Sequence, residues 1–184
     1  EIRPGDTVPV LANSPSLQPG AYAMHWGYTL PDGKLLFNAR SETAAEKAIF
    51  KDGMAQRRCL IPASSYFEWE RREGQKTKYA IRPAGAEMLY LAGIYHLENH
   101  DGAVDPSFAI LTRSAAPEIA FIHDRMPVIF PPVRIRSRIS SLEAASSVIE
   151  NIFLKTVLRF SRSFSIIPLS RTLPDSAAYL HHCP

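Results

Sequence analysis

Short runs rich in β-branched and aromatic residues recur along the first 130 residues of the chain, separated by clusters of Gly, Pro, Asn and Asp. Such runs are typical of strands, and the clusters between them are typical of turns. The pattern predicts strands within residues 2–11, 24–28, 35–37, 58–62, 66–69, 79–82, 88–95, 107–112, 128–130 and 166–167. Many short strands with few helices indicate an antiparallel sheet system in an α+β fold.

Helical patterns are fewer than strand patterns. Thr43 and Glu46 have the spacing of a capping box. In this motif a hydroxyl and a carboxylate each accept a hydrogen bond from a backbone N–H that is otherwise unpaired at the start of a helix. A helix is therefore expected over residues 43–51. The sequence also predicts a short helix at 117–122 and a longer one from 140 to about 158.

The composition is that of a soluble globular protein, since 46% of the 184 residues are hydrophobic and 21% are charged. A chain of this length buries a sufficient core without a disulfide or a metal, so we expect one domain over residues 1–184. Cys59 and Cys183 do not have the spacing of a disulfide framework, a zinc ribbon or a redox motif. No run approaches the ~18 apolar residues of a membrane-spanning helix, and a cytoplasmic location is expected.

The net charge of +3 is unevenly distributed along the chain. Residues 1–130 contain 14 Lys or Arg and 15 Asp or Glu, a balance of −1, whereas residues 131–184 contain 7 and 3, a balance of +4. A weakly positive total permits nucleic-acid binding without arguing for it, because a binding surface is a local patch.

Two segments place polar side chains beside apolar strands. Residues 38–42 (NARSE) form either a solvated turn between a strand and a helix or part of a functional site. In the strand at 66–69, alternation places Tyr66 and Glu68 on one face and the other two aromatic residues on the opposite face. Burial of Glu68 among aromatic rings would raise its pKa and make it a general acid. The alternative is a Glu68 on the solvent-facing side of an edge strand.

A third polar segment, containing His123 and Arg125, joins a predicted helix to a strand. His123 would carry protons near neutral pH, unless it is a loop histidine with a structural hydrogen bond. Arg125 would bind a phosphate through two hydrogen bonds. Cys59 is a candidate nucleophile with His123 as its base, although its apolar strand favours a buried packing role. Metal-binding histidine spacings, a P-loop and a dinucleotide-binding fingerprint are missing from the sequence, so no metal or cofactor is expected.

Several separate strings, taken in order, resemble the SRAP family of SOS-response-associated peptidases. They are WG at 26–27, NARSET at 38–43, RRCLIPASSYFEW at 57–69, KY at 78–79, LAGIY at 91–95, ILT at 110–112 and HDRMPVIF at 123–130. The similarity covers about residues 1–130. It implies a mixed fold with a pseudo-barrel of antiparallel strands and a positively charged cleft for single-stranded DNA with an adjoining duplex.

The resemblance implies a DNA-damage response protein that captures abasic sites covalently. In this family a cysteine exposed by self-removal of the initiator methionine condenses, through its thiol and α-amine, with the sugar aldehyde to give a thiazolidine. By the same resemblance Glu68 is the acid/base, His123 gives a proton to the sugar oxygen, and Asn38 holds the N-terminal residue or the sugar. Five residues would contact DNA phosphates or bases: Trp26, Arg40, Thr112, Arg125 and Met126.

The sequence departs from the family pattern at both ends. The Met-Cys-Gly-Arg opening of the family is missing from this sequence, whose first residue is Glu1. We expect that opening upstream of Glu1, because the partner residues Asn38, Glu68 and His123 are retained. Residues 131–184 are divergent. Two other functions stay open: a non-catalytic module that binds single-stranded DNA, and a thiol hydrolase that uses Cys59. The expected partner is single-stranded DNA with an abasic site or a duplex junction, bound by a monomer associated with the nucleoid in a bacterial or phage cytosol.

Overall fold

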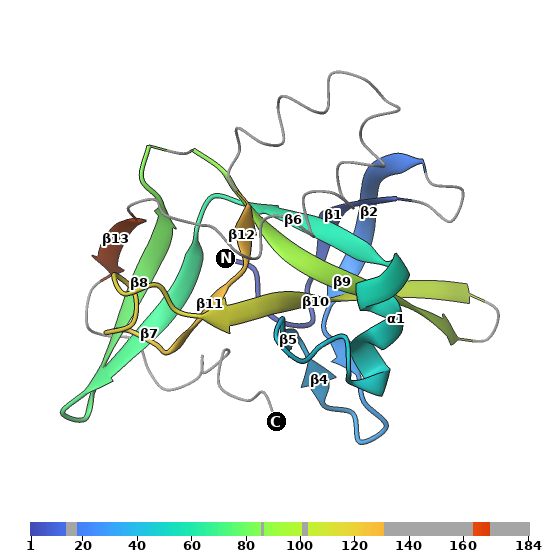
Figure 1. Cartoon of the computed structure of the whole chain (residues 1–184), viewed down its shortest axis with the longest axis horizontal. Helices are drawn as coiled ribbons and strands as arrows, with labels where there is room; N and C mark the ends of the chain where they lie inside the picture. Colours follow the sequence, from blue (N-terminus) through green and yellow to red (C-terminus); the bar gives the residue numbers. More distant parts are fainter. Residues whose placement is uncertain (14–17, 86, 101–102, 131–163, 170–184) are drawn as a thin grey trace.

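A closed barrel of five strands occupies the centre of the computed structural model, which describes residues 1–13, 18–85, 87–100, 103–130 and 164–169 (Figure 1). The barrel strands are β1 (Thr7–Asn13), β2 (Pro19–Trp26), β6 (Arg58–Ala63), β9 (Leu89–His100) and β10 (Ala103–Ser114). Neighbouring strands pair in the order β10-β2-β1-β6-β9, and pairing between β9 and β10 closes the ring. Closure gives every barrel strand a partner on both sides.

Shorter strands extend this sheet around β10. β5 (Asn38–Arg40) runs parallel to β10, β11 (Arg125–Pro127) runs antiparallel to β10, and β12 (Ile129–Phe130) pairs with β9. A small hairpin of β3 (Tyr28–Thr29) and β4 (Leu35–Leu36) precedes β5. The second half of β10 is therefore flanked by the two segments that carry most of the polar residues singled out in the sequence.

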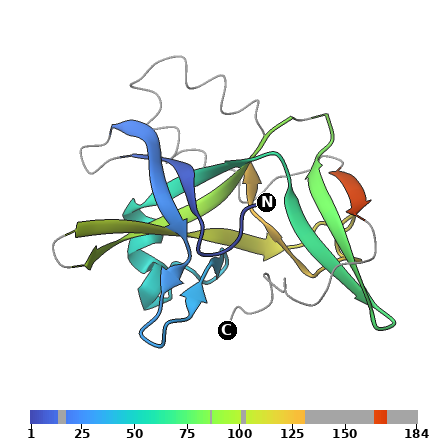
Figure 2. The same ribbon diagram turned by 180° about the vertical axis from the view of Figure 1, so that it is seen from behind.

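A separate antiparallel sheet of three strands lies beside the barrel: β7 (Tyr66–Arg72), β8 (Gln75–Pro83) and β13 (Phe164–Leu169). The β7–β8 hairpin projects away from the barrel, and the N-terminus lies between the barrel and this sheet (Figures 1 and 2). Glu73 and Gly74 at the hairpin tip have φ angles of 51° and 76°. Two successive positive φ angles are typical of the two-residue turns that match the twist of a hairpin.

The barrel strands alternate between two clusters of buried residues. One contains Cys59 and Ile61, and the other contains Leu60 and Ile94 together with Phe50 of α1 (Ala48–Gln56). Gly93 in β9 allows close packing, because a Cβ at this position would lie 2.6 Å from Ile61 Cδ1 and 2.9 Å from Cys59 Sγ.

Several sequence-based expectations of secondary structure are wrong in detail. The helix predicted over 43–51 begins at Ala48, and Lys47 caps it without a side-chain hydrogen bond, so Thr43 and Glu46 do not form the expected capping box. Residues 41–46 are turns instead, because the Arg40 carbonyl, at the end of β5, accepts the N–H groups of the chain as it reverses.

The other differences concern turns and pairing. Residues 117–122 form turns rather than a helix, and most strands extend further than the apolar runs indicated, because ladder pairing continues into polar residues. The pairings of β10 with β2 and β5 are parallel, which departs from the fully antiparallel expectation. The helix predicted from 140 lies outside the described residues.

Candidate functional site

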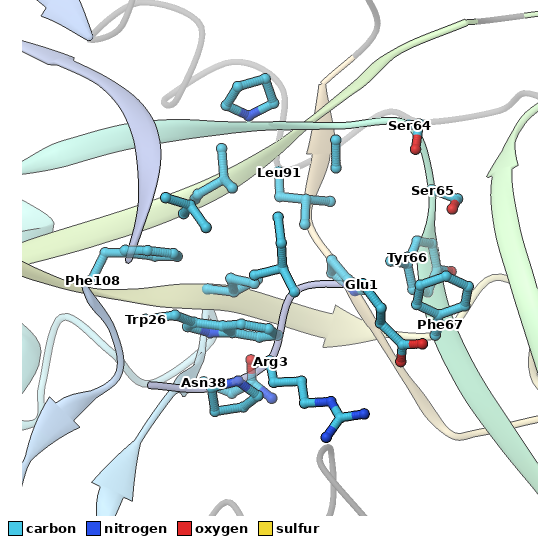
Figure 3. Close-up of a pocket in the computed structure, with 18 of the residues that line it drawn as sticks. Glu1, Arg3, Trp26, Asn38, Ser64, Ser65, Tyr66, Phe67, Leu91 and Phe108 are labelled. Carbon is cyan, nitrogen blue, oxygen red and sulfur yellow. The ribbon is translucent and has the colours of Figure 1, made fainter. Parts of the chain in front are cut away.

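A pocket of about 440 Å³ lies where the N-terminal residues meet the barrel and the start of β7 (Figure 3). Its walls are largely aromatic and aliphatic. The labelled lining residues come from the N-terminus, β2, β5, the β6–β7 connection, β7, β9 and β10, and they include Glu1, Arg3, Trp26, Asn38, Tyr66 and Phe67.

β5 places Asn38 in the wall of this pocket. Its pairing with β10, which sets Asn38 beside Ile110, leaves the Asn38 side chain 5% exposed. Trp26 lies near it with its indole N–H donating a 3.0 Å hydrogen bond to the Phe37 carbonyl, and its ring stacks on Phe108 at 6.4 Å. Arg40, two residues along β5, is exposed to solvent. The pocket therefore has an aromatic wall and a buried amide, while Arg40 on the same strand as the amide is exposed outside the pocket lining.

Glu68 is buried with Tyr66 on the inner face of β7, as the alternation predicted. Glu68 is 3% exposed, and its Oε2 accepts a long hydrogen bond of 3.4 Å from the Trp69 N–H. Burial raises the pKa of Glu68 to about 8, and the charge of Asp124 adds to the rise. The solvent-facing alternative is thus wrong, and burial favours the protonated form of the Glu68 carboxyl.

His123 is held through its Nδ1 atom. The Arg125 backbone N–H donates to Nδ1 at 2.9 Å in the tautomer with its proton on Nε2, and the Arg125 carbonyl oxygen lies 3.3 Å from the same Nδ1. Asp124 Oδ1 lies 3.1 Å from the same Nδ1 and provides an acceptor when the ring takes up a second proton. The ring is 15% exposed, and Asp124, its neighbour in sequence, is the residue whose charge reaches Glu68. Glu68 and the His123 turn consequently belong to one electrostatic environment.

The guanidinium of Arg125 is engaged within the protein. Two of its nitrogens donate to the Glu42 carboxylate at 2.8 Å each, and Nη2 also donates to Thr112 Oγ1 at 3.2 Å. This pairing lowers the pKa of Glu42 to about 2. Arg125 therefore makes with Glu42 the pair of hydrogen bonds that was expected with a phosphate. Phosphate binding by Arg125 stays a prediction.

Two other predicted DNA contacts are buried. Thr112 is 6% exposed and lies beneath Arg125, where its hydroxyl donates to the Ala39 carbonyl at 3.5 Å. Met126 is 5% exposed, and its sulfur accepts the Ala116 N–H at 3.3 Å. Both residues support the positions of their neighbours, and this conformation offers almost none of their surface to a base.

Lys78 was missed as a site residue by reasoning from the sequence. Its Nζ is 2.6 Å from Glu1 Oε2 and lies 4.1 Å from the centre of the Phe67 ring, which places a buried cation behind the pocket wall. Lys78 stands directly opposite Trp69 in the β7–β8 ladder. Counting outward from a two-residue turn at Glu73 and Gly74 pairs Trp69 with Lys78, so the sequence contained a signal for this contact.

Cys59 lies in the barrel wall as a fully buried free thiol, and burial raises its pKa. This placement agrees with a packing role and separates Cys59 from the pocket, of which it is not a lining residue. Cys183 lies outside the described residues. Over the same described ranges, no three His, Cys, Asp or Glu side chains gather as a metal site would require, and no helix is long and apolar enough to cross a membrane.

Residues 1–172 match the family described as SOS response associated peptidase. The chain belongs to the SRAP family. The resemblance read from the motifs is thereby confirmed, and the matched range extends beyond the 130 residues over which the motifs were recognised.

Similar proteins carry names that refer to abasic sites. The chain is 35% identical to the abasic site processing protein YobE of Bacillus subtilis over 114 residues, 58% of this chain and 52% of that protein. It is 32% identical to the abasic site processing protein YedK of Escherichia coli over 126 residues, 65% and 57% of the two chains. The chain spans about half the length of these relatives.

Solved structures share the fold of this chain. A Bordetella bronchiseptica protein superposes with a TM-score of 0.72 at 22% identity, covering 92% of this chain and 86% of that one. A phage-related protein of the same organism gives a TM-score of 0.63 at 24% identity, covering 91% and 80%. Both likenesses concern the fold.

Proposed function

We propose that this SRAP protein processes abasic sites in DNA and captures them covalently in single strands. The observation that carries the proposal is the burial of Glu68, which is 3% exposed, close enough to the His123 turn for the charge of Asp124 to act on it. A carboxyl with a raised pKa and an imidazole are suited to moving protons during attack on an aldehyde. Asn38 lines the pocket, whereas Glu68 and His123 are not among its lining residues. The names of the relatives, abasic site processing proteins, support the same substrate.

The proposed nucleophile is a cysteine encoded upstream of Glu1 and exposed by self-removal of the initiator methionine. Its α-amine adds to the open-chain sugar aldehyde and water leaves, giving an imine. The thiol then adds across the C=N bond, so that sulfur and nitrogen share one carbon in a thiazolidine. Cys59 is unsuited to this role because it is buried in the barrel wall.

Each site residue has a defined task in this reaction. Glu68 gives a proton to the departing water and takes it back when the adduct reverses. His123 donates through Nε2 to the sugar oxygen during ring opening, and Asp124 accepts from Nδ1 when the ring is doubly protonated. Asn38 holds the N-terminal residue or the sugar from the pocket wall.

DNA binding in the proposal uses exposed and stacked side chains around the pocket. Arg40 binds a phosphate next to the lesion, and Trp26 lies beside the flanking base. Contacts of this kind select an unpaired strand or a junction with duplex more than they select a base sequence. We propose that a monomer acts in this way in the cytosol, near the nucleoid.

A denaturing gel tests the proposal. The full-length encoded protein is mixed with a single-stranded oligonucleotide that contains one abasic site, and with an intact oligonucleotide as control. We expect a shifted band that survives denaturation only with the abasic strand and disappears in the chain that begins at Glu1. Retardation on a native gel without a denaturation-resistant band would instead support the non-catalytic binding module.

A further inference from the structure

The two faces of the β7–β8 hairpin differ in chemistry. The ladder places Trp69 opposite Lys78 and Arg71 opposite Lys76. Because opposite residues share a face and alternate residues repeat it, these four residues lie on the same face as Phe67. This surface, here called the cationic hairpin face, contains three cations, two aromatic rings and no acidic residue of either strand.

Acidic residues are confined to the opposite face of the same strands. Glu68 and Glu70 alternate along β7 with the residues of the cationic hairpin face. Glu70 accepts a 2.8 Å hydrogen bond from the Tyr79 hydroxyl. Arg72 shares that opposite face and is 77% exposed at its side chain. The separation of charge is therefore a property of the two faces and not of the hairpin as a whole.

The side chains of the cationic hairpin face lie against one another. Lys76 Nζ is 5.4 Å from the centre of the Trp69 ring, and Lys78 Nζ is at the same distance from it on the buried side. Glu1 neutralises Lys78, whereas Arg71 is exposed and Lys76 is half-buried. The outer part of the face thus keeps a positive charge beside an aromatic ring.

This face is continuous with the pocket. Phe67 and Trp69 line the pocket, and from there the hairpin projects away from the barrel (Figures 1 and 3). From Phe67 to Arg71 the strand spans ~13 Å at ~3.3 Å per residue, a length that two or three nucleotides of an extended strand can follow. A strand leaving the pocket therefore meets an aromatic ring first and exposed cations next.

We propose that the cationic hairpin face binds the unpaired DNA strand as it leaves the pocket, with a base stacked on Trp69 and phosphates bound by Lys76 and Arg71. The inference rests on the proposed function, because it extends the same DNA site outward. Aromatic platforms interleaved with cations are the usual composition of surfaces that bind single strands without reading their sequence.

The test compares the full-length protein with the variant Arg71→Ala/Lys76→Ala and with Arg72→Ala, which removes one cation from the opposite face. Affinity for a fluorescein-labelled single-stranded oligonucleotide is measured by anisotropy between 50 and 200 mM salt. Losing two phosphate contacts lowers the slope of log affinity against log salt by about 1.4. We therefore expect wild type to lose about 7-fold more affinity than the double variant over this range, and Arg72→Ala to behave like wild type.

The outcomes are separable from those of the proposed function. Adduct formation by the wild-type protein is followed in parallel with an oligonucleotide that contains an abasic site, and its absence counts against abasic-site capture. Circular dichroism confirms that the variants are folded. A wild-type salt slope in the double variant, an equal change in Arg72→Ala, or an effect on duplex DNA alone would overturn the assignment of the hairpin face.

Discussion

Replacing Glu68 with Gln removes a buried group whose pKa burial raises from 4.5 to about 8. Between these two values the unfolded chain carries an ionised Glu68 while the folded protein keeps it protonated. Unfolding therefore releases a proton, and the stability of wild type falls as pH rises from about 4.5 to about 8. The stability difference changes by about 1.4 kcal/mol per pH unit and levels off near the folded pKa, which amounts to about 3 kcal/mol at pH 7 and about 4 kcal/mol at pH 8.

The isosteric amide has no proton to release, so Glu68→Gln is expected to be the more stable protein at pH 7 to 8 and nearly equal to wild type at pH 4.5. Urea unfolding at several pH values measures the difference, since titrations elsewhere in the chain affect both proteins alike. Glu73→Gln at the exposed hairpin tip serves as a control, and we expect its stability difference to be small and independent of pH.

The same variant is expected to lose adduct formation while gaining stability. A side chain that only packs would not combine these effects. If the difference between Glu68→Gln and wild type stayed flat from pH 4.5 to pH 8, the raised pKa would be refuted, and with it the reason for assigning Glu68 as the proton donor.

Three further substitutions test other parts of the structure. Cys59→Ala is expected to cost about 1–2 kcal/mol in urea unfolding, because it leaves a small void, and to form the DNA adduct at the wild-type rate on a denaturing gel. Glu42→Gln is expected to cost about 1 kcal/mol of unfolding free energy through the weakened pair with Arg125, an effect that should shrink at high salt. Gly93→Ala is expected to cost about 2–3 kcal/mol in the same assay, because the added Cβ would lie 2.6 Å from Ile61 Cδ1 and 3.1 Å from a backbone oxygen.

Local patterns predicted the strands better than the helices. The alternation of Tyr66 to Trp69 correctly placed Tyr66 and Glu68 on one face of β7, because side-chain direction in a strand repeats every second residue, but it left open whether that face is buried. The capping-box spacing of Thr43 and Glu46 did not produce a cap because the Arg40 carbonyl accepts the N–H groups of Thr43 and Ala44 in turns, and the helix begins later, at Ala48.

The family and the identity of the central polar residues were available from the sequence alone, because they reside in short strings of adjacent letters. The pairings of Glu42 with Arg125 and of Glu1 with Lys78 join residues 83 and 77 positions apart. Such contacts depend on which strands the closed barrel and the second sheet bring together. The sequence therefore determined which chemical groups the protein has and which face of each strand carries them. Only the tertiary structure decided their partners and the pKa of Glu68, because burial and charge pairing are set by residues distant in the chain.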